Sequence, residues 1–195
     1  MRTRDENKET AIREKALEMI VTDGFDGLSM QKLAKAAGVS PATIYIYYKN
    51  REDLLNSLYN LVNETFAEVA LQGFDPDDSL EKGLWIQWKN RLEFINDYPH
   101  YFRFHEQFRN SPLINHRDVK FDAFRESMAR FVKNAIAKGE MKKMDPELFW
   151  SLAYGSFYSL LKFHFQQKTM MNRHYKVNDD NLKQLLKMVI AALKK

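Results

Sequence analysis

The stretch from Ser29 to Arg51, SMQKLAKAAGVSPATIYIYYKNR, most restricts what this chain can fold into. Ser29 can cap a first short helix, in which apolar residues recur at spacings of three and four. Gly38 can adopt the positive φ that ends a helix, and Ser40 followed by Pro41 is a strong start signal for a second helix. Two short helices around a glycine-containing turn form a helix-turn-helix unit, whose second helix enters the major groove of DNA.

The charge of this stretch favours the same interpretation. It contains Lys32, Lys35, Lys49 and Arg51 and no acidic residue, whereas the whole chain has 26 Asp and Glu against 30 Lys and Arg. The formal net charge of +4 is modest, so a nucleic-acid-binding surface would be confined to a small region. The residues expected at the DNA interface are Ser29, Ser40, Pro41, Ala42, Thr43, Tyr45, Ile46, Tyr47 and Lys49.

Different roles are expected within this set. Tyr47 and Lys49 are the candidates for phosphate contacts, and residues 41–46, apart from Ile44, are the candidates for base contacts. Tyr45 or Tyr48 could instead belong to the core. Tyr48 lies four residues after Ile44 and is expected to be mainly core. Two arginines near the N-terminus, Arg2 and Arg4, could form an arm that touches DNA or could simply be solvated.

The motif GVSPATIYIYYKNREDLL at residues 38–55 resembles the signature of TetR-type transcriptional repressors. In that family a Gly-Val-Ser turn leads into a recognition helix ending in a Tyr-x-Tyr-Phe-Lys-like run. Tyr48 stands where the family more often has Phe. Ile46 stands where it often has a polar or basic residue, which leaves an apolar contact such as one with a thymine methyl group. The close resemblance covers roughly the first 55 residues.

An all-α fold of about nine helices is expected, because long segments show helical periodicity and the chain has only 7 Gly and 5 Pro. The expected helices cover approximately residues 9–23, 30–37, 41–48, 51–73, 76–98, 101–108, 116–138, 146–167 and 180–193. Residues 1–50 should form a three-helix DNA-binding domain with a helix-turn-helix. Residues 51–195 should form a larger helical ligand-binding and dimerisation domain, and the long helix starting near residue 51 should join the two.

Several classes of function are disfavoured. With no cysteine the chain has no disulfide or thiolate metal site, and it has no apolar run as long as a membrane span, so we expect a cytoplasmic protein without a membrane partner. The five histidines lack zinc-ligand spacing, so neither a metal nor another cofactor is expected. No nucleophile elbow, phosphate loop or thiol suggests an enzyme. The acidic pairs at 77–78 and 179–180 are interpreted as helix caps.

The segment after residue 80 is dense in aromatic residues, which can line an apolar pocket or form plain core. Arg91, His105, Gln87 and Tyr154 are the polar groups that could orient a ligand. The candidate ligand-binding residues are Trp85, Trp88, Arg91, Phe104, His105, Phe108, Phe124, Tyr154 and Tyr158.

The segment from Pro146 to about Gln167 is apolar on much of its circumference, so it must be buried on several sides. With the last helix it could form a four-helix interface with a second subunit, as the resemblance implies, or it could belong to a purely intramolecular core. The candidate interface residues are Trp150, Gly155, Ser159, Leu182, Leu186 and Val189.

Together these features predict a ligand-responsive DNA-binding transcriptional regulator, expected to act as a repressor. A homodimer would bind a palindromic operator in double-stranded DNA and leave it when a small apolar or amphipathic effector binds. The alternative is a helical interaction or adaptor protein that has lost DNA binding.

Overall fold

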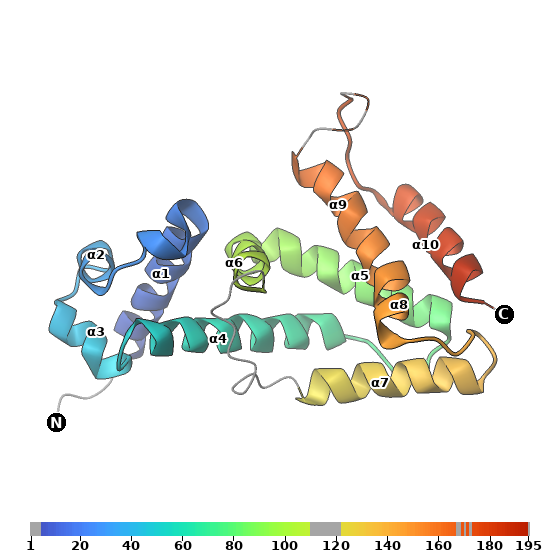
Figure 1. The fold of residues 1–195 in the computed structure, drawn as a ribbon, viewed down its shortest axis with the longest axis horizontal. Coiled ribbons are helices and arrows are strands. Elements are labelled where there is room, and N and C mark those ends of the chain that lie inside the picture. The colour runs from blue at the N-terminus through green and yellow to red at the C-terminus, as the bar shows by residue number, and fades with distance from the viewer. Residues whose placement is uncertain (1–4, 110–121, 167–168, 170, 172, 195) are drawn as a thin grey trace. The chain divides into compact units, whose positions relative to one another are not determined.

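A computed structural model describes residues 5–109, 122–166, 169, 171 and 173–194. The elements are α1 (Glu6–Gly27), α2 (Met30–Ala36), α3 (Pro41–Tyr47), α4 (Arg51–Leu71), α5 (Leu80–Asp97), α6 (Pro99–Arg109), α7 (Asp122–Ala137), α8 (Pro146–Trp150), the π-helical segment η1 (Ser151–Gly155), α9 (Ser156–Gln166) and α10 (Asp179–Leu193) (Figure 1). Trp150 and Ser156, at the two ends of η1, keep helical φ and ψ, so α8, η1 and α9 form one continuous helix. Counted in this way, the described residues form nine helices and no strand, which confirms the expected all-α fold.

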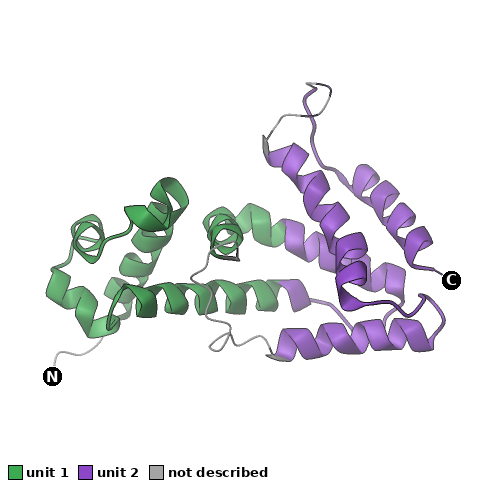
Figure 2. Ribbon diagram, viewed as in Figure 1, with its two compact units in different colours: residues 1–69, 93–121 green, residues 70–92, 122–195 purple. Residues whose placement is uncertain are grey.

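The chain divides into two compact units (Figure 2). Unit 1 comprises residues 1–69 and 93–121, and unit 2 comprises residues 70–92 and 122–195. Helices α4 and α5 therefore each begin in one unit and end in the other. The boundary expected at residue 50 separates a DNA-binding segment from a ligand-binding and dimerisation segment. It is a boundary of function, which the packing of the units does not test, so it stays a prediction.

The N-terminal part of unit 1 is the expected three-helix domain of α1, α2 and α3. Helix α1 begins after Asp5, whose side chain accepts hydrogen bonds from the backbone N–H groups of Asn7 (3.1 Å) and Lys8 (3.4 Å). Its helical geometry breaks at Gly24, where φ is +74°, as the sequence predicts. Apolar residues of α1 at three- and four-residue spacing are buried, and the helix packs against α2 and α6.

Helices α4 and α6 complete the core of unit 1. Leu54, Leu58 and Val62 on α4 are fully buried. The ring of Tyr59, on the same helix, stacks on Phe108 of α6 with centroids 4.4 Å apart. Stacked and edge-to-face rings stabilise a contact beyond the area they bury.

In unit 2 the contact between α5 and α7 depends on a glycine. A Cβ atom added to Gly83 would lie 2.3 Å from the ring of Phe131, which is itself fully buried. Only glycine therefore lets the two helices come this close.

The acidic pair at Asp77 and Asp78 does not cap α5, so that expectation is wrong. The helix begins at Leu80, and Ser79 provides the cap by accepting from the Lys82 backbone N–H (3.3 Å). Asp77 instead binds α7, where the Asn134 amide donates to it (2.5 Å) and Arg130 forms an ion pair with it. Asp78 pairs with the Lys82 ammonium (2.7 Å). Both of these partners of Asp77, Arg130 and Asn134, lie more than 50 residues from it in the sequence.

The second acidic pair lies in the first turn of α10, as expected, but the cap itself is Asn178. The side chain of Asn178 accepts from the Asn181 backbone N–H, and the Asn181 side chain accepts from the Asn178 N–H, each at 3.0 Å. Asp179 binds Lys89 of α5 (2.7 Å), and this bond holds the pKa of the carboxyl below its usual value.

Two further expectations fall on residues that the structure does not describe. The start of a helix near residue 116 lies outside the described residues, and the helix is described from Asp122 onward. The possible arm carrying Arg2 and Arg4 also lies outside them.

Candidate nucleic-acid interface

The turn between α2 and α3 has the geometry that its sequence predicts. Gly38 has a φ of +67°, and its N–H donates to the Lys35 carbonyl oxygen (3.3 Å). The Val39 N–H donates to the Ala34 carbonyl oxygen (2.9 Å). This pair of bonds is a Schellman motif, which satisfies the last carbonyl groups of α2. Ser29 caps the start of the same helix by accepting from the Lys32 N–H (3.1 Å).

Helix α3 is capped by Ser40, whose hydroxyl oxygen accepts from the Thr43 N–H (3.2 Å) and lies 2.8 Å from the Thr43 hydroxyl oxygen. Ile44 and Tyr48 are buried and anchor the helix to the core, which confirms the core position expected for Tyr48. Pro41 and Ala42 are exposed in the first turn. The seven-residue helix therefore has one anchored face and an exposed N-terminal turn.

The opposite face of α3 carries two large exposed side chains. Tyr45 is 55% exposed and Ile46 is 39% exposed. Both side chains are therefore accessible to a partner molecule on this face of the helix. Thr43 lies at the edge of the same face. Of the residues expected to face bases, all five therefore retain accessible surface.

Tyr47, which was expected to contact phosphate, makes an internal contact instead of pointing freely into solvent. Its ring is buried, and its hydroxyl donates to the Asp5 carbonyl oxygen (3.1 Å) and accepts from the Asp5 N–H (2.9 Å). It thereby joins the end of α3 to the start of α1. Its role as a phosphate contact stays a prediction.

Lys49 is exposed at the start of α4. Its backbone N–H donates to the Asp53 carboxylate (2.8 Å), and the Asn50 side chain accepts from the Asp53 N–H (2.8 Å). These two bonds, both made by Asp53, fix the first turn of α4. Because the backbone around Lys49 is fixed, its ammonium can reach a phosphate with little loss of backbone entropy.

Arg51 was counted with the basic residues of this stretch, but the structure gives it an internal role. Its Nε donates to the Leu28 carbonyl oxygen (3.2 Å), and its Nη2 donates to that of Phe25. Arg51 therefore links the start of α4 to the end of α1 by hydrogen bonds. No local sequence pattern connects residues this far apart.

A small polar pocket of about 280 Å³ adjoins the start of α3. It is lined by Asp5, Lys8, Gly38, Val39, Ser40, Thr43, Ile46 and Tyr47. Lys8 forms an ion pair with Asp5 (3.1 Å) at its edge. The start of α1 thus contributes a cation next to the expected recognition helix, which the sequence analysis did not identify.

Two family descriptions match the chain. Residues 12–58 match "Bacterial regulatory proteins, tetR family", and residues 86–192 match "Tetracyclin repressor-like, C-terminal domain". The second match alone covers more than half of the chain. The protein belongs to the TetR family of transcriptional regulators. It is therefore a DNA-binding transcription regulator and not an enzyme.

Individual relatives agree with this assignment. The chain is 31% identical over 101 residues to an uncharacterized HTH-type transcriptional regulator of Haemophilus influenzae, covering 52% of this chain and 53% of that protein. It is 44% identical over 53 residues to the fatty acid metabolism regulator protein of Bacillus subtilis, covering 27% of each. The matches thus span about half of the first relative and about a quarter of the second.

Solved structures match over nearly the whole chain. A TetR family transcription regulator from Marinobacter aquaeolei VT8 has a TM-score of 0.76 and 27% identity, covering 99% of this chain and 98% of that one. A putative TetR family regulator from Vibrio parahaemolyticus has a TM-score of 0.78 and 25% identity, covering 96% and 99%.

The nine candidate ligand residues of this TetR-family chain fall into both units. Trp85, Trp88, Arg91, Phe124, Tyr154 and Tyr158 belong to unit 2, and Phe104, His105 and Phe108 belong to unit 1. In unit 1, Phe104 and Phe108 are fully buried and pack against Phe25, with centroids 6.3 and 5.8 Å apart. His105 stacks on Tyr59 at 5.9 Å. These three residues build the unit 1 core, and their contact with a ligand stays a prediction.

In unit 2, Arg91 is the centre of a buried cluster. Its Nη2 donates to the Gln87 side-chain oxygen and its Nη1 to the Tyr158 hydroxyl, both at 3.3 Å. Its Cζ lies 4.3 Å from the ring centroid of Tyr154 and 5.7 Å from that of Phe124. Burial raises the pKa of the Tyr154 hydroxyl, and the nearby guanidinium opposes this rise. Three of the candidate residues, Phe124, Tyr154 and Tyr158, thus contact the guanidinium of a fourth.

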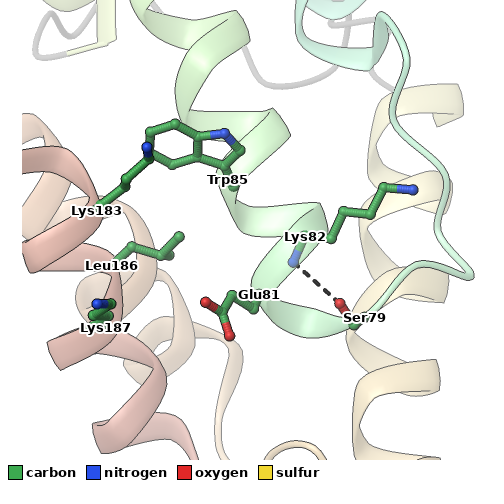
Figure 3. Close-up of a pocket in the computed structure, with 7 residues that line it drawn as sticks. All are labelled: Ser79, Glu81, Lys82, Trp85, Lys183, Leu186 and Lys187. Carbon is green, nitrogen blue, oxygen red and sulfur yellow. Dashed lines mark hydrogen bonds between the residues drawn. The ribbon is translucent and has the colours of Figure 1, made fainter. Parts of the chain in front are cut away.

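Trp85 instead lines an open groove of about 460 Å³ between α5 and α10 (Figure 3). Figure 3 shows Trp85 projecting from α5 toward Lys183 and Leu186 on α10. The ammonium groups of Lys183 and Lys89 lie 5.7 and 5.8 Å from the centroid of its ring. The groove is lined by three lysines, Lys82, Lys183 and Lys187, and by one acidic residue, Glu81, so its electrostatic field is positive.

Some of the candidate dimer-interface residues are exposed and others are buried. Trp150 and Ser159 are exposed and Gly155 is partly exposed, but Leu182, Leu186 and Val189 are buried within their own unit. Burial leaves these three little surface to offer to a second subunit. Their role in an interface stays a prediction that the packing of α10 does not favour.

The described part of the chain contains neither a metal-binding cluster nor a membrane-spanning helix. In that part, no three His, Asp or Glu side chains are grouped so that they could hold a metal ion. None of the described helices has both the length and the hydropathy needed to cross a bilayer.

Proposed function

We propose that the protein is a homodimeric repressor that leaves a palindromic operator when a small apolar or amphipathic effector binds to it. The observation that carries the proposal is the exposed face of α3, where Tyr45 and Ile46 project from a capped helix whose opposite face is buried. A short, anchored helix with an exposed N-terminal turn fits the major groove. Ile46 would contribute an apolar contact with a thymine methyl group rather than a hydrogen bond.

Homodimer formation is supported by exposed apolar side chains in unit 2. They are Leu148 (57% exposed), Trp150 (41%), Leu152 (37%), Phe165 (46%) and Met188 (60%). All lie on the continuous helix α8–α9 or on α10, and large exposed apolar residues that gather on neighbouring elements mark interfaces. A two-fold axis relating two such helix pairs would build a four-helix interface. It would present two recognition helices about 34 Å apart, one turn of DNA, to a palindromic site.

Effector control is supported by the aromatic cluster around Arg91 in unit 2. An effector that binds only one of two dimer arrangements shifts the population toward that arrangement. Coupling of about 1–3 kcal/mol would change the affinity for DNA about 5- to 150-fold, which is enough for a switch.

Native mass spectrometry tests this proposal directly. The purified protein is measured alone, with a duplex copied from the region upstream of its own gene, and again after addition of an apolar cell extract. We expect a dimer that holds one duplex, loses it on addition of the extract and retains a small molecule of measurable mass. A monomer, or a dimer that ignores this duplex, would contradict the proposal and favour an adaptor function.

A pair of matched variants makes the DNA measurement specific. Ala42→Glu places a carboxylate on the exposed first turn of α3, and Ala123→Glu places one on the exposed first turn of α7. Like-charge repulsion from phosphate should abolish the duplex complex in Ala42→Glu and leave it intact in Ala123→Glu. Both variants should remain dimers.

A further inference from the structure

The polar pocket of about 280 Å³ beside α3 joins the start of α1 to the recognition helix. Asp5 and Lys8 line it from α1, and Thr43 and Ile46, two candidates for base contacts, line it from α3. A recognition helix lies in the major groove, and the elements beside it meet the phosphates that border the groove. When α3 binds DNA, a backbone phosphate would therefore come close to this pocket.

Lys8 brings a positive charge to the pocket. Its ammonium lies 3.1 Å from the Asp5 carboxylate, and the structure describes no other partner for it. An ammonium has three N–H donors, and the contact with Asp5 uses one of them. The two side chains are 53% and 41% exposed, and an ion pair between exposed side chains stabilises a protein little. The Lys8 ammonium can therefore move to a phosphate at small cost.

The Asp5 carboxylate opposes this contact. One of its oxygens accepts from the backbone N–H groups of Asn7 and Lys8 as the cap of α1, and the other pairs with the Lys8 ammonium. The hydrogen bond from Lys8 holds the pKa of the Asp5 carboxyl below its usual value, so the group is charged at neutral pH. It competes with a phosphate for Lys8 and repels that phosphate.

The side of the pocket at the start of α3 offers a neutral donor. The hydroxyl oxygens of Ser40 and Thr43 lie 2.8 Å apart, so one hydroxyl donates to the other. When Thr43 donates, the proton of the exposed Ser40 hydroxyl is left for an acceptor in the pocket. Serine hydroxyl groups are among the common donors to phosphate oxygens.

From these contacts we propose that the pocket binds a phosphate of the DNA backbone through the Lys8 ammonium and the Ser40 hydroxyl, and that the Asp5 carboxylate limits the affinity by competing for Lys8. The inference rests on DNA binding through α3, as the proposed function does. It requires neither a palindromic operator nor an effector.

A second ion pair on α1 provides the matched control. Lys15 and Glu18 have the same three-residue spacing as Asp5 and Lys8, lie 2.6 Å apart and are similarly exposed (46% and 54%). Neither of them lines the pocket. If the pair of Asp5 and Lys8 only stabilised the start of α1, changes in the two pairs would affect DNA binding alike.

Fluorescence anisotropy with a generic duplex, over a range of salt concentrations, tests the inference in the full-length protein. Lys8→Met should weaken binding and make the slope of log affinity against log salt shallower by about 0.9, the value for one lost phosphate contact. Asp5→Asn should strengthen binding up to about fivefold, because asparagine caps a helix as well as aspartate does but carries no charge. Lys15→Met and Glu18→Gln should leave affinity and slope near those of the parent.

The double variant tests the competition for Lys8. Once Lys8→Met has removed the ammonium, Asp5→Asn should strengthen binding less than it does in the parent. Equal gains in the two backgrounds would show that Asp5 does not act through Lys8. Because both pairs are exposed, each single variant should melt within about 4 °C of the parent, which separates loss of contact from loss of folding.

The outcomes separate this inference from the proposed function. If the parent binds the generic duplex and Lys8→Met binds it with the same affinity and slope, the phosphate pocket is wrong and operator control stands. An equal loss in Lys15→Met would also overturn the pocket. If Lys8→Met flattens the slope but no palindromic duplex is preferred to the generic one, operator control fails and the phosphate pocket stands.

Discussion

The hydroxyl of Tyr47, at the end of the recognition helix, forms two hydrogen bonds with the backbone of a single residue, Asp5. It donates to the carbonyl oxygen at 3.1 Å and accepts from the amide at 2.9 Å. Asp5 is the N-cap of α1, so this one side chain fixes where α1 begins relative to α3. The position of Lys8, which borders the polar pocket beside α3, follows from the same contact.

Tyr47→Phe should destabilise the helix-turn-helix domain by about 1–2 kcal/mol, because two part-buried hydrogen bonds are lost. Urea unfolding measures this loss, and amide hydrogen exchange should be faster in the first turn of α1. Tyr45→Phe is the matched control, since Tyr45 is on the same helix and exposed. If Tyr47→Phe kept its stability and lost only DNA affinity, the hydroxyl would serve phosphate instead of Asp5.

Lys49→Ala should weaken binding to all DNA sequences alike. If the exposed ammonium neutralises about one phosphate, its removal should make the slope of log affinity against log salt shallower by about 0.9. Fluorescence anisotropy over a range of salt concentrations measures both effects. Lys162→Ala, which removes an exposed lysine on α9, should behave like the parent. An unchanged affinity and slope in Lys49→Ala would show that the phosphate contact is elsewhere.

Thr43→Ala should alter sequence preference rather than general affinity. Thr43 lies in the first half of α3, where side chains meet base edges, and its hydroxyl is held 2.8 Å from that of Ser40. Selection of bound duplexes from a random pool would detect the change at one position of each half-site. Thr43→Ser keeps the hydroxyl and should retain most of the preference. A uniform loss of affinity across all duplexes would assign Thr43 to the backbone instead.

Structural features of this chain that depend on neighbouring residues follow from the sequence, and features that depend on distant residues do not. The caps at Ser29 and Ser40 and the turn at Gly38 act over three to five residues, so the sequence alone predicts them correctly. The contacts of Tyr47 with Asp5 and of Arg51 with Phe25 link residues 42 and 26 positions apart. No periodicity connects such pairs, which is why Tyr47 was expected to contact phosphate and Arg51 was counted only with the basic residues of its stretch.

The same distinction applies in unit 2. Apolar spacing shows that α10 has a buried stripe, but it does not say whether the stripe faces the same chain or a second copy. Leu182, Leu186 and Val189 prove to be buried within unit 2. In the same way, Asp77 was interpreted as a cap because its partners on α7 are distant in sequence.

Gly83→Ala should destabilise unit 2 by about 1–3 kcal/mol, because the new methyl group would overlap the buried Phe131 ring. Chemical unfolding gives the magnitude. In a double-mutant cycle, Phe131→Leu should make Gly83→Ala less costly, since a smaller side chain leaves room for the methyl group. Additive effects of the two substitutions would mean that α5 and α7 adjust their separation instead.

Leu152→Glu should convert the proposed dimer into a monomer. Leu152 is 37% exposed on the continuous helix formed by α8, η1 and α9, and its neighbours Leu148 and Trp150 are also exposed. A carboxylate there costs the protomer little, because water still reaches it, but in a two-fold interface two like charges would be desolvated together. Sedimentation velocity measures the change in mass. Lys162→Glu, on the same helix, changes the charge at an exposed position by two units, more than the one unit of Leu152→Glu, and should leave the dimer intact. A Leu152→Glu protein that stays dimeric would place the interface on another face of unit 2.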